Sequence, residues 1–208
     1  MAREGYPFIL AALLCIIILF FVAPWWLELF FVPLGVFVVA FFRDPERTPP
    51  SDPGAIVSPA DGRVIKAERA DDDRFTGAPA WKISIFMNVF NVHVNRVPAD
   101  CKVLEVRYNP GKFFNASFDK ASLLNEQNAI VAEAPGARHF AFNQIAGLIA
   151  RRIVCYARPG DSLKRGERFG MIRFGSRVDV YLPAGCSVAV RVGDKVRAGT
   201  STLGYWNA

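Results

Sequence analysis

Apolar residues are concentrated at the N-terminal end of this 208-residue chain. Two apolar runs occupy residues 8–23 and 27–42, and the second is broken only by Glu28 and Pro33. A helix over either run would be about 24 Å long at ~1.5 Å per residue, which is shorter than a hydrocarbon core of about 30 Å. The residues between the runs include two tryptophans, which favour the headgroup level of a bilayer. The pattern predicts an N-terminal hydrophobic helical hairpin over residues 1–43.

The hairpin is expected to anchor the chain in a membrane, either as two short spans or as a re-entrant wedge. No small-x-small cleavage signal follows the first run, which argues against a secretory signal peptide. Arg3 precedes the first run, and Arg43 and Arg47 follow the second. By the positive-inside bias both ends would face the cytoplasm, which predicts a location on the cytoplasmic face of the cell membrane. A buried core hairpin in a soluble protein is the alternative.

Beyond the hairpin the pattern changes to a proline-rich linker, residues 44–54, and then to short alternating runs separated by turn residues. These runs predict strands over residues 56–57, 64–67, 81–86, 101–108, 128–133, 153–157, 171–174, 178–182 and 187–192. One helix is predicted outside the N-terminal block, over residues 142–151, because Ile145, Leu148 and Ile149 would share a face. We expect a β-rich (α+β) domain over residues 55–208.

Two stretches of this domain are alike. Residues 159–167 and 192–200 each contain a Gly-Asp pair and a later glycine, with an apolar residue between them. Glycine suits tight turns, and the apolar residue can pack inward. The pattern is similar to the hammerhead turns of biotinyl and lipoyl carrier domains, and residues 58–64 add a related turn and strand. No lysine lies in a methionine-flanked hairpin tip, so the pattern predicts a barrel-sandwich fold without a carrier function.

Charge and cysteine content limit the classes of partner. The formal net charge is +6, from 25 basic and 19 acidic residues, which suits an anionic membrane surface or substrate. Basic residues are not interleaved with aromatics, so we expect no nucleic-acid partner. The four cysteines are scattered without a Cys-x-x-Cys pair, and the chain has two histidines. We therefore expect neither a metal site nor a disulfide framework.

Histidine is the usual proton-transfer group near neutral pH. His93 alternates with Asn91 and Asn95 in an extended segment, so the three side chains would share one face of a strand. That composition suits a polar site in which amides orient the imidazole, and a structural histidine is the alternative. His139 follows a Pro-Gly loop and is interpreted as incidental.

Asp61 and the Gly175-Ser176 pair complete the candidate chemistry. Asp61 is either a turn residue or the group that fixes the tautomer of His93. Gly175-Ser176 lies in a predicted strand-to-strand turn. A strained Gly-Ser peptide permits the serine Oγ to attack the preceding carbonyl and leave an ester, if a base takes its proton. β-Elimination and hydrolysis would then give a pyruvoyl group. Gly-Ser pairs are common, so the pair alone does not establish this chemistry.

Six short motifs follow one another along the chain. They are FFRDPER at 41–47, VSPADG at 57–62, the segment 85–98, NEQNA at 125–129, QIAG at 144–147 and the segment 169–183. As an ordered set they resemble the phosphatidylserine decarboxylase proenzymes, specifically their short, bacterial-type branch. The resemblance covers nearly the whole chain.

In that family the serine of the Gly-Ser pair becomes a pyruvoyl prosthetic group by internal cleavage. The resemblance implies a cut between Gly175 and Ser176 and a heterodimer of a membrane-bound β chain, residues 1–175, and an α chain, residues 176–208. A higher oligomer is left open. The pyruvoyl group derived from Ser176 would form a Schiff base with the amine of phosphatidylserine and accept the electrons released with carbon dioxide. The expected product is phosphatidylethanolamine, made in phospholipid biosynthesis at the membrane.

The chain departs from the longer branch of the family at two motifs. Leu-Gly-Ser-Thr is replaced by FGSR at 174–177, and His-x-x-His by HVNR at 93–96, so Arg96 stands where a second histidine would be. We therefore expect His93 to act both as the base in self-cleavage and as the acid in decarboxylation, with Asp61 orienting it.

Substrate binding is expected from Arg96, Asn91 and Asn95, with the arginine holding the phosphate or carboxylate. Two alternatives are a non-enzymatic, membrane-tethered scaffold with the same barrel, and a pyruvoyl enzyme that acts on another amino acid-headed lipid or on a soluble amino acid. The hairpin argues against a soluble substrate, because it would hold the active site near the bilayer.

Overall fold

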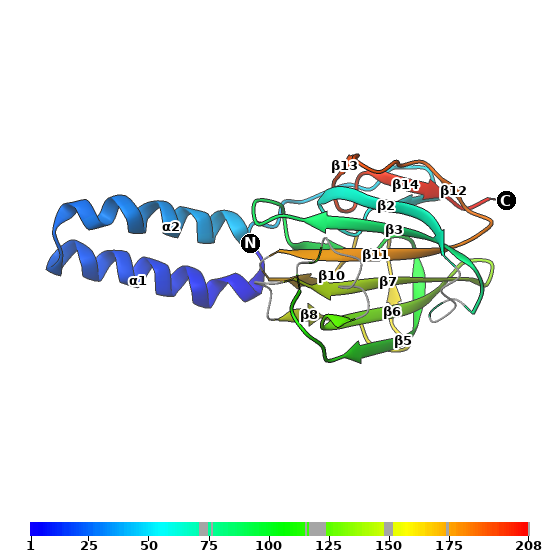
Figure 1. Cartoon of the computed structure of the whole chain (residues 1–208), viewed down its shortest axis with the longest axis horizontal. Coiled ribbons are helices and arrows are strands. Elements are labelled where there is room, and N and C mark those ends of the chain that lie inside the picture. Colours follow the sequence, from blue (N-terminus) through cyan, green and yellow to red (C-terminus); the bar gives the residue numbers. More distant parts are fainter. Residues whose placement is uncertain are drawn as a thin grey trace. The chain divides into compact units, whose positions relative to one another are not determined.

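The computed structural model describes residues 1–70, 75, 77–114, 116, 124–147, 152–173 and 175–207. The chain divides into two compact units, Met1–Glu46 and Arg47–Ala208. The described part of the first unit is helical, and that of the second is built from antiparallel strands (Figure 1). The β-rich class and the N-terminal helical hairpin are as the sequence predicts.

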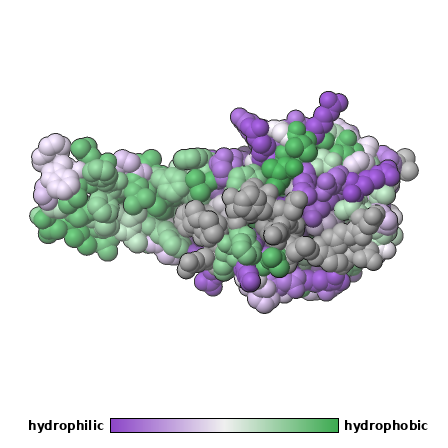
Figure 2. Space-filling model, viewed as in Figure 1, coloured by the Kyte–Doolittle hydropathy of each residue, from purple (hydrophilic) through white to green (hydrophobic). Residues whose placement is uncertain are grey.

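The first unit contains two apolar helices. The 3-10 helix Arg3–Gly5 leads into α1 (Tyr6–Val22), and the 3-10 helix Trp25–Leu27 leads into α2 (Glu28–Phe41). Figure 2 shows hydrophobic residues along the visible side of this pair. The helical stretch Arg3–Val22 is long and apolar enough to cross a membrane by length and composition, and Trp25–Phe41 is shorter.

Close contacts hold the two helices together. A Cβ on Gly35 of α2 would lie 2.7 Å from Cδ1 of Ile16 in α1, so glycine permits the approach. At the open end, the amide of Ala2 donates to the carbonyl of Phe42 at 2.8 Å. The rings of Phe8 and Phe42 stack with their centroids 5.3 Å apart. Phe42 therefore closes the hairpin at the point where the chain leaves it.

The second unit combines one large sheet with two small ones. Its strands are β1 (Ala55–Val57), β2 (Gly62–Ala70), β3 (Ala80–Met87), β4 (Val94–Arg96), β5 (Cys101–Asn109), β6 (Gln127–Ala134), β7 (Arg138–Ala146), β8 (Ile153–Cys155), β9 (Ser162–Leu163), β10 (Arg168–Ile172), β11 (Ser176–Pro183), β12 (Ser187–Val188), β13 (Lys195–Val196) and β14 (Thr202–Tyr205). The large sheet has the order β13-β2-β3-β11-β7-β6-β5-β9, and the small sheets are β1-β14-β12 and β4-β10-β8. Figure 1 shows the long strands from β2 to β5 side by side, with β11 in their middle.

The strand order is internally repeated. Strands β4 to β10 pair among themselves in the same way as β1, β2, β3, β11, β12, β13 and β14, and they are inserted between β3 and β11. The pair β3–β11 therefore corresponds to β6–β7, which is joined by a short turn with positive φ at Gly136 and Ala137. At the equivalent place the chain leaves β3 at Met87, passes through the inserted repeat, and reaches β11 at Ser176. Ser176 is thus the first residue after the inserted repeat.

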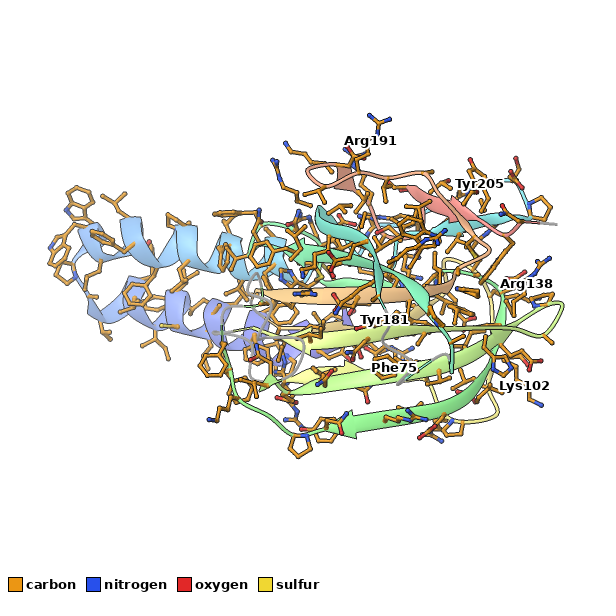
Figure 3. All side chains as sticks on the ribbon, turned by 45° about the vertical axis from the view of Figure 1, so that its right-hand side comes forward. Phe75, Lys102, Arg138, Tyr181, Arg191 and Tyr205 are labelled. Atoms are coloured by element: carbon orange, nitrogen blue, oxygen red, sulfur yellow. The ribbon has the colours of Figure 1, made fainter. Side chains whose placement is uncertain are left out.

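The two predicted hammerhead turns occupy equivalent places in this repeat. Their glycines all have positive φ, at Gly160, Gly166, Gly193 and Gly199. In the first turn the amide of Arg158 donates to the carboxylate of Asp161, and in the second the amide of Arg191 (Figure 3) donates to that of Asp194, both at 2.8 Å. The same local sequence therefore gives the same local structure twice.

Both faces of the central strands are buried. The main core lies on one face of the large sheet and includes Val178 and Val180 of β11. The opposite face of β11 carries Tyr181, whose ring lies 5.0 Å from that of Phe75 between centroids (Figure 3). A strand that is covered on both sides can carry apolar residues without alternation.

That double burial explains one wrong prediction. The first part of the helix predicted over residues 142–151 is a strand, β7, in which every residue from Phe140 to Ala146 is buried. Apolar residues on both faces of a strand can imitate the spacing of one helical face. Residues 148–151 lie outside the described residues.

Two strand predictions near the candidate site also change. Of the segment containing Asn91, His93 and Asn95, only Val94–Arg96 is a strand. Gly175-Ser176 does not join two paired strands, because β10 belongs to a small sheet and β11 to the large one. Glycine 175 lies in the connection with φ +68°, and Ser176 begins β11.

Residues 47–54 of the predicted linker lie in the strand-rich unit. The guanidinium of Arg165 donates to the carbonyls of Pro50 and Ala55, both at 2.7 Å. Arg47 forms an ion pair with Asp61. The segment is therefore fixed to the surface of the unit by two arginines.

Candidate active site

Ser176 lies inside the sheet at the start of its central strand. It pairs with Met87 of β3 on one side and with Ala146 of β7 on the other. The serine is fully buried, and its Oγ lies 3.6 Å from Sδ of Met87. Residues two apart on a strand share a face, so Ser176 faces the main core together with Val178. A thioether is a weak acceptor, so the hydroxyl has a weak partner.

A chain of buried carboxamides leads to the same methionine. Asn95 Nδ2 lies 3.8 Å from Sδ of Met87. Gln144 Nε2 donates to Oδ1 of Asn95 at 3.0 Å and to the carbonyl of Val154 at 3.2 Å. Asn128 Nδ2 in turn donates to Oε1 of Gln144 at 3.4 Å. All three amides are buried.

These hydrogen bonds determine the orientation of the Asn95 side-chain amide. The carbonyl of Val154 can only accept, so the group of Gln144 that faces it must be the amino group. That amino group also faces Asn95, which must therefore present its oxygen to Gln144 and its Nδ2 to Met87. Asn95 Nδ2 is thus an N–H donor near Ser176, and its neighbour is the sulfur of Met87, a weak acceptor.

His93 is the buried histidine of the described residues, whereas His139 is half exposed and pairs with Glu133 at 3.2 Å. His93 Nδ1 lies 2.9 Å from the carbonyl oxygen of Asn91. Because a carbonyl only accepts, Nδ1 carries a proton, and Nε2 is the basic nitrogen of the neutral ring. The Asn91 side chain accepts from the amide of Asn88 at 2.9 Å, which fixes the turn before His93.

The structure does not join Asp61 to His93 by a hydrogen bond between these described side chains. Asp61 accepts from the amide of Ala198 at 2.8 Å and from Nη2 of Arg47 at 2.9 Å. The oxygen that orients Nδ1 of His93 is the Asn91 carbonyl. The expected direct contact is therefore replaced by an ion pair that links the first and second sequence motifs.

The Asp61 turn nevertheless touches the strand that follows His93. The amide of Arg96 in β4 donates to the carbonyl of Pro59 at 2.9 Å. The internal repeat contains a counterpart of this turn, in which Asp100 accepts from the amide of Arg165 at 2.8 Å and the carbonyl of Pro98 accepts from β1. The two Pro-Ala-Asp turns differ in the strand that they hold, since the Asp61 turn holds β4 and the Asp100 turn holds β1.

Arg96 lies against the hammerhead turns. Its Nη1 donates to the carbonyl of Gly166 at 2.8 Å, and a Cβ on Gly199 would lie 2.8 Å from its Cδ. The side chain is buried. Since neighbours on a strand point to opposite faces, Arg96 and Asn95 diverge. In this arrangement Arg96 joins the two turns, and the Asn95 amide is directed at Sδ of Met87, the same atom that Ser176 Oγ approaches.

Arg177 follows Ser176 and is fully buried on the opposite face of the sheet. Its guanidinium forms a two-pronged ion pair with Asp179 and donates to Oγ of Ser84 at 2.8 Å. Lys82 Nζ lies 3.6 Å from the same aspartate. Bidentate arginine–carboxylate pairs fix geometry well, and the contacts with Ser84 and Lys82 tie the part of β11 that follows Ser176 to β3.

The three thiols of the strand-rich unit do not supply a competing nucleophile. Burial, together with the charges of Asp100 and Glu167, raises the pKa of Cys101 to about 12. Burial raises the pKa of Cys186 to about 11, and it also raises the pKa of Cys155. A thiol with so high a pKa is almost wholly protonated near neutral pH. Within the part of the chain that the structure describes, no group of three or more histidine, cysteine, aspartate or glutamate residues could hold a metal ion.

Sequence reasoning missed the residues that act through the sheet register. The sequence analysis gives Met87 only as a member of the segment 85–98, and it places Gln144 in a motif on a predicted helix. Their meeting with Ser176 depends on the pairing of β11 with β3 and β7. The signal available in the sequence was the presence of both residues in the ordered motifs.

Comparison with known proteins gives a consistent result. The family model described as "Phosphatidylserine decarboxylase" matches residues 34–204. A protein of Neisseria meningitidis serogroup C named phosphatidylserine decarboxylase proenzyme is 52% identical over 202 residues, which cover 97% of this chain and 75% of the relative. Proteins of the same name from Syntrophus aciditrophicus and Paraburkholderia phytofirmans are each 50% identical. They cover 98% and 97% of this chain, and 96% and 95% of their own lengths.

Proposed function

The chain belongs to the phosphatidylserine decarboxylase family, and from this premise we propose that it is a proenzyme that cuts itself between Gly175 and Ser176. The cut would turn Ser176 into a pyruvoyl group, which the enzyme uses to decarboxylate phosphatidylserine to phosphatidylethanolamine. The observation that carries the proposal is the environment of Ser176. Its hydroxyl is buried at the first position of β11, directly after a glycine with φ +68°.

Self-cleavage needs a hydroxyl, a carbonyl and a base. Ser176 Oγ attacks the carbonyl carbon of Gly175, so that a C–O bond forms as the C–N bond breaks and the Oγ proton passes to the freed amine. Loss of the Cα proton with cleavage of the Cβ–O bond then leaves Gly175 as a carboxylate and residue 176 as dehydroalanine. One water hydrolyses this enamine, releasing ammonia and leaving the ketone. We assign the base to Nε2 of His93.

The residues around Ser176 fit a pyruvoyl group. The group is uncharged and has only acceptor oxygens, so its surroundings must offer donors and need no counter-ion. Asn95 offers such a donor, because Gln144 holds its oxygen away and its Nδ2 lies against the same sulfur as Ser176 Oγ. When present, the ketone would condense with the substrate amine and accept the electron pair released with carbon dioxide.

During turnover the chain's own residues would orient the substrate and move protons. His93 Nε2 would hold the proton that the substrate carbon needs after carbon dioxide leaves. Of the three residues expected to bind substrate, Asn95 keeps that role in our proposal. Arg96 and Asn91 are assigned to shaping the site, through the hammerhead turns and the turn before His93.

The strand pairing supports a stable heterodimer after the cut. β11 pairs with β3 and β7 along most of its length. β14 pairs with β1, and β13 pairs with β2. Every one of these partners lies in residues 1–175, so the proposed α chain, residues 176–208, would stay bound by sheet hydrogen bonds after its covalent link is lost.

We propose that the apolar hairpin anchors the enzyme to the cytoplasmic face of the cell membrane, where its lipid substrate is found. The helix length and composition of Arg3–Val22 support this. Arg47 pairs with Asp61, so the positive-inside argument rests on Arg3 and Arg43. The net charge of +6 suits an anionic lipid surface.

Denaturing gels test the proposal. The full chain should run as two fragments, the smaller of which is blocked to N-terminal sequencing, and Ser176→Ala should run intact near 23.0 kDa. Ser162→Ala is the control, since Ser162 lies on the edge strand β9 of the same sheet, away from Ser176. It should be cut normally. A wild-type chain that runs intact would favour the scaffold alternative.

The substrate is tested with the cut enzyme. Vesicles that contain phosphatidylserine should yield phosphatidylethanolamine and carbon dioxide, and free serine should yield no carbon dioxide above the blank. Carbon dioxide released from free serine at a comparable rate would contradict the lipid substrate while leaving the self-cleavage intact.

A further inference from the structure

We propose that Gly147 is a positioning residue for self-cleavage, because it leaves room for the carbonyl group of Gly175. The carbon of this carbonyl belongs to the peptide bond that is cut. This inference rests on the proposed function. Gly147 directly follows β7, whose last residue Ala146 pairs with Ser176. A Cβ built on Gly147 would lie 2.1 Å from the carbonyl oxygen of Gly175 and 3.0 Å from its carbonyl carbon.

A methyl group at position 147 would clash with the Gly175 carbonyl in its observed position. A distance of 2.1 Å lies far inside van der Waals contact, which begins near 3.4 Å. The obstacle is backbone, so it cannot rotate away as the end of a flexible side chain can. Ala116 Cβ lies 3.4 Å from the same point, which limits the space for a methyl on that side. Either β7 or the Gly175 carbonyl would have to move.

The carbonyl affected is the one that reacts. Serine Oγ must approach the face of the Gly175 carbonyl, and effective proximity depends on alignment within fractions of an ångström. Gly175 itself has φ +68°, and among the described residues no atom lies within 4 Å of the position that its Cβ would take. The close approach to Gly147 therefore limits the positions that the carbonyl group of Gly175 can take. Gly147 acts through this carbonyl and does not touch the reacting hydroxyl in our account.

The protein offers a matched control for the clash. A Cβ on Gly204 of β14 would lie 2.3 Å from the carbonyl oxygen of Ser187. That contact is also between backbone and glycine on neighbouring strands, β12 and β14, but the carbonyl belongs to a peptide bond that takes no part in the chemistry. Gly204→Ala should therefore disturb packing in a similar way without affecting the cut.

The experiment compares the rate of appearance of the two chains in the full-length wild type, Gly147→Ala and Gly204→Ala. We expect Gly147→Ala to be cut about 100-fold more slowly and Gly204→Ala to be cut at close to the wild-type rate. Hydroxylamine cleaves esters and leaves peptide bonds intact, so it shows whether the variant is blocked before or after the ester forms. The Gly147→Ala precursor should resist it, because the ester has not formed.

Folding is measured separately, so that an uncut chain is not mistaken for a misfolded one. Thermal unfolding of both glycine variants in the Ser176→Ala background gives their midpoints without processing, and rates are then compared at a temperature below the lower midpoint. A folded Gly147→Ala chain that is cut at the wild-type rate, or whose precursor is split by hydroxylamine, overturns the inference and leaves the proposed function standing. An uncut wild type would overturn both.

Discussion

The Oγ of Ser176 and the Sδ of Met87 lie 3.6 Å apart across the β11–β3 ladder, at the end where β3 leads into the inserted repeat and the repeat leads into β11. The serine hydroxyl is therefore buried beside a thioether, which accepts hydrogen bonds weakly. Asn95 Nδ2 lies 3.8 Å from the same sulfur. Because the hydroxyl has only a weak hydrogen bond in the ground state, little hydrogen-bond energy is lost when a base takes its proton.

Met87→Leu should preserve self-cleavage. The exchange nearly conserves volume and should lower the free energy of unfolding by less than about 1.5 kcal/mol. The sulfur is a weak acceptor, so its loss should change the cleavage rate only a few-fold. Chain appearance on a denaturing gel measures the rate. A stable Met87→Leu protein that remains uncut would show that the sulfur is required.

His93→Ala should accumulate as the uncut precursor. Removing a general base slows proton transfer by about 10²–10⁴-fold, and we expect cleavage to slow by a factor in that range. His139→Ala is the matched control, because His139 is half exposed and pairs with Glu133 on the surface. It should be cut normally. Cleavage of folded His93→Ala at the rate of His139→Ala would remove His93 from maturation.

Asp61→Asn should slow self-cleavage, and Asp100→Asn should not. We propose that Asp61 positions His93 indirectly, through the turn whose Pro59 carbonyl accepts from the Arg96 amide. The Asp100 turn makes the equivalent bond to β1, which lies outside the candidate site. We expect at least a tenfold slower cut for Asp61→Asn at a temperature at which both variants are folded. Equal rates would limit Asp61 to a structural role.

The two aspartates should also differ in stability. Asp61→Asn breaks the ion pair with Arg47 and should lower the free energy of unfolding by about 2–3 kcal/mol, less than the roughly 3–5 kcal/mol of a fully buried pair, because 10% and 11% of the two side chains are exposed. Asp100→Asn keeps an acceptor oxygen for the Arg165 amide and should cost about 1 kcal/mol. Urea unfolding of both in the Ser176→Ala background gives the difference.

Arg96→Lys should destabilise the protein and leave substrate affinity unchanged. The buried guanidinium bonds the Gly166 carbonyl and fills the space under Gly199. A lysine retains the charge and loses the planar fork, so we expect a loss of about 1.5–3 kcal/mol in the free energy of unfolding. The KM for phosphatidylserine in vesicles should remain within about twofold. A large rise in KM with unchanged stability would restore the original expectation that Arg96 binds substrate.

Local features of the fold could be predicted from the sequence because their causes are local. The hairpin follows from two apolar runs, and the hammerhead turns follow from glycines that all adopt positive φ at the expected places. β7 could not be predicted, because its burial on both faces depends on strands and side chains distant in sequence. Its apolar spacing therefore looked helical.

The site was predictable as a set of residues and not as a geometry. The sequence predicts Ser176, His93, Asn95 and Asp61 as candidate site residues, and their roles remain predictions. The contacts between them depend on register and on pairings between distant segments. The partner of Asp61 is Arg47 rather than His93, and the strand alternation that turns Asn95 toward Met87 turns Arg96 away from it. Such choices follow from the sheet and cannot be read from motif order.

The intact mass of the small chain tests the central claim most directly. Our account predicts a fragment of residues 176–208 that is lighter than the unmodified peptide by one ammonia, because the serine amine has been replaced by a ketone. Reduction with borohydride in the presence of an amine should add that amine to its first residue. A fragment with an intact N-terminal serine, or a chain that is never cut at Gly175-Ser176, would contradict the account.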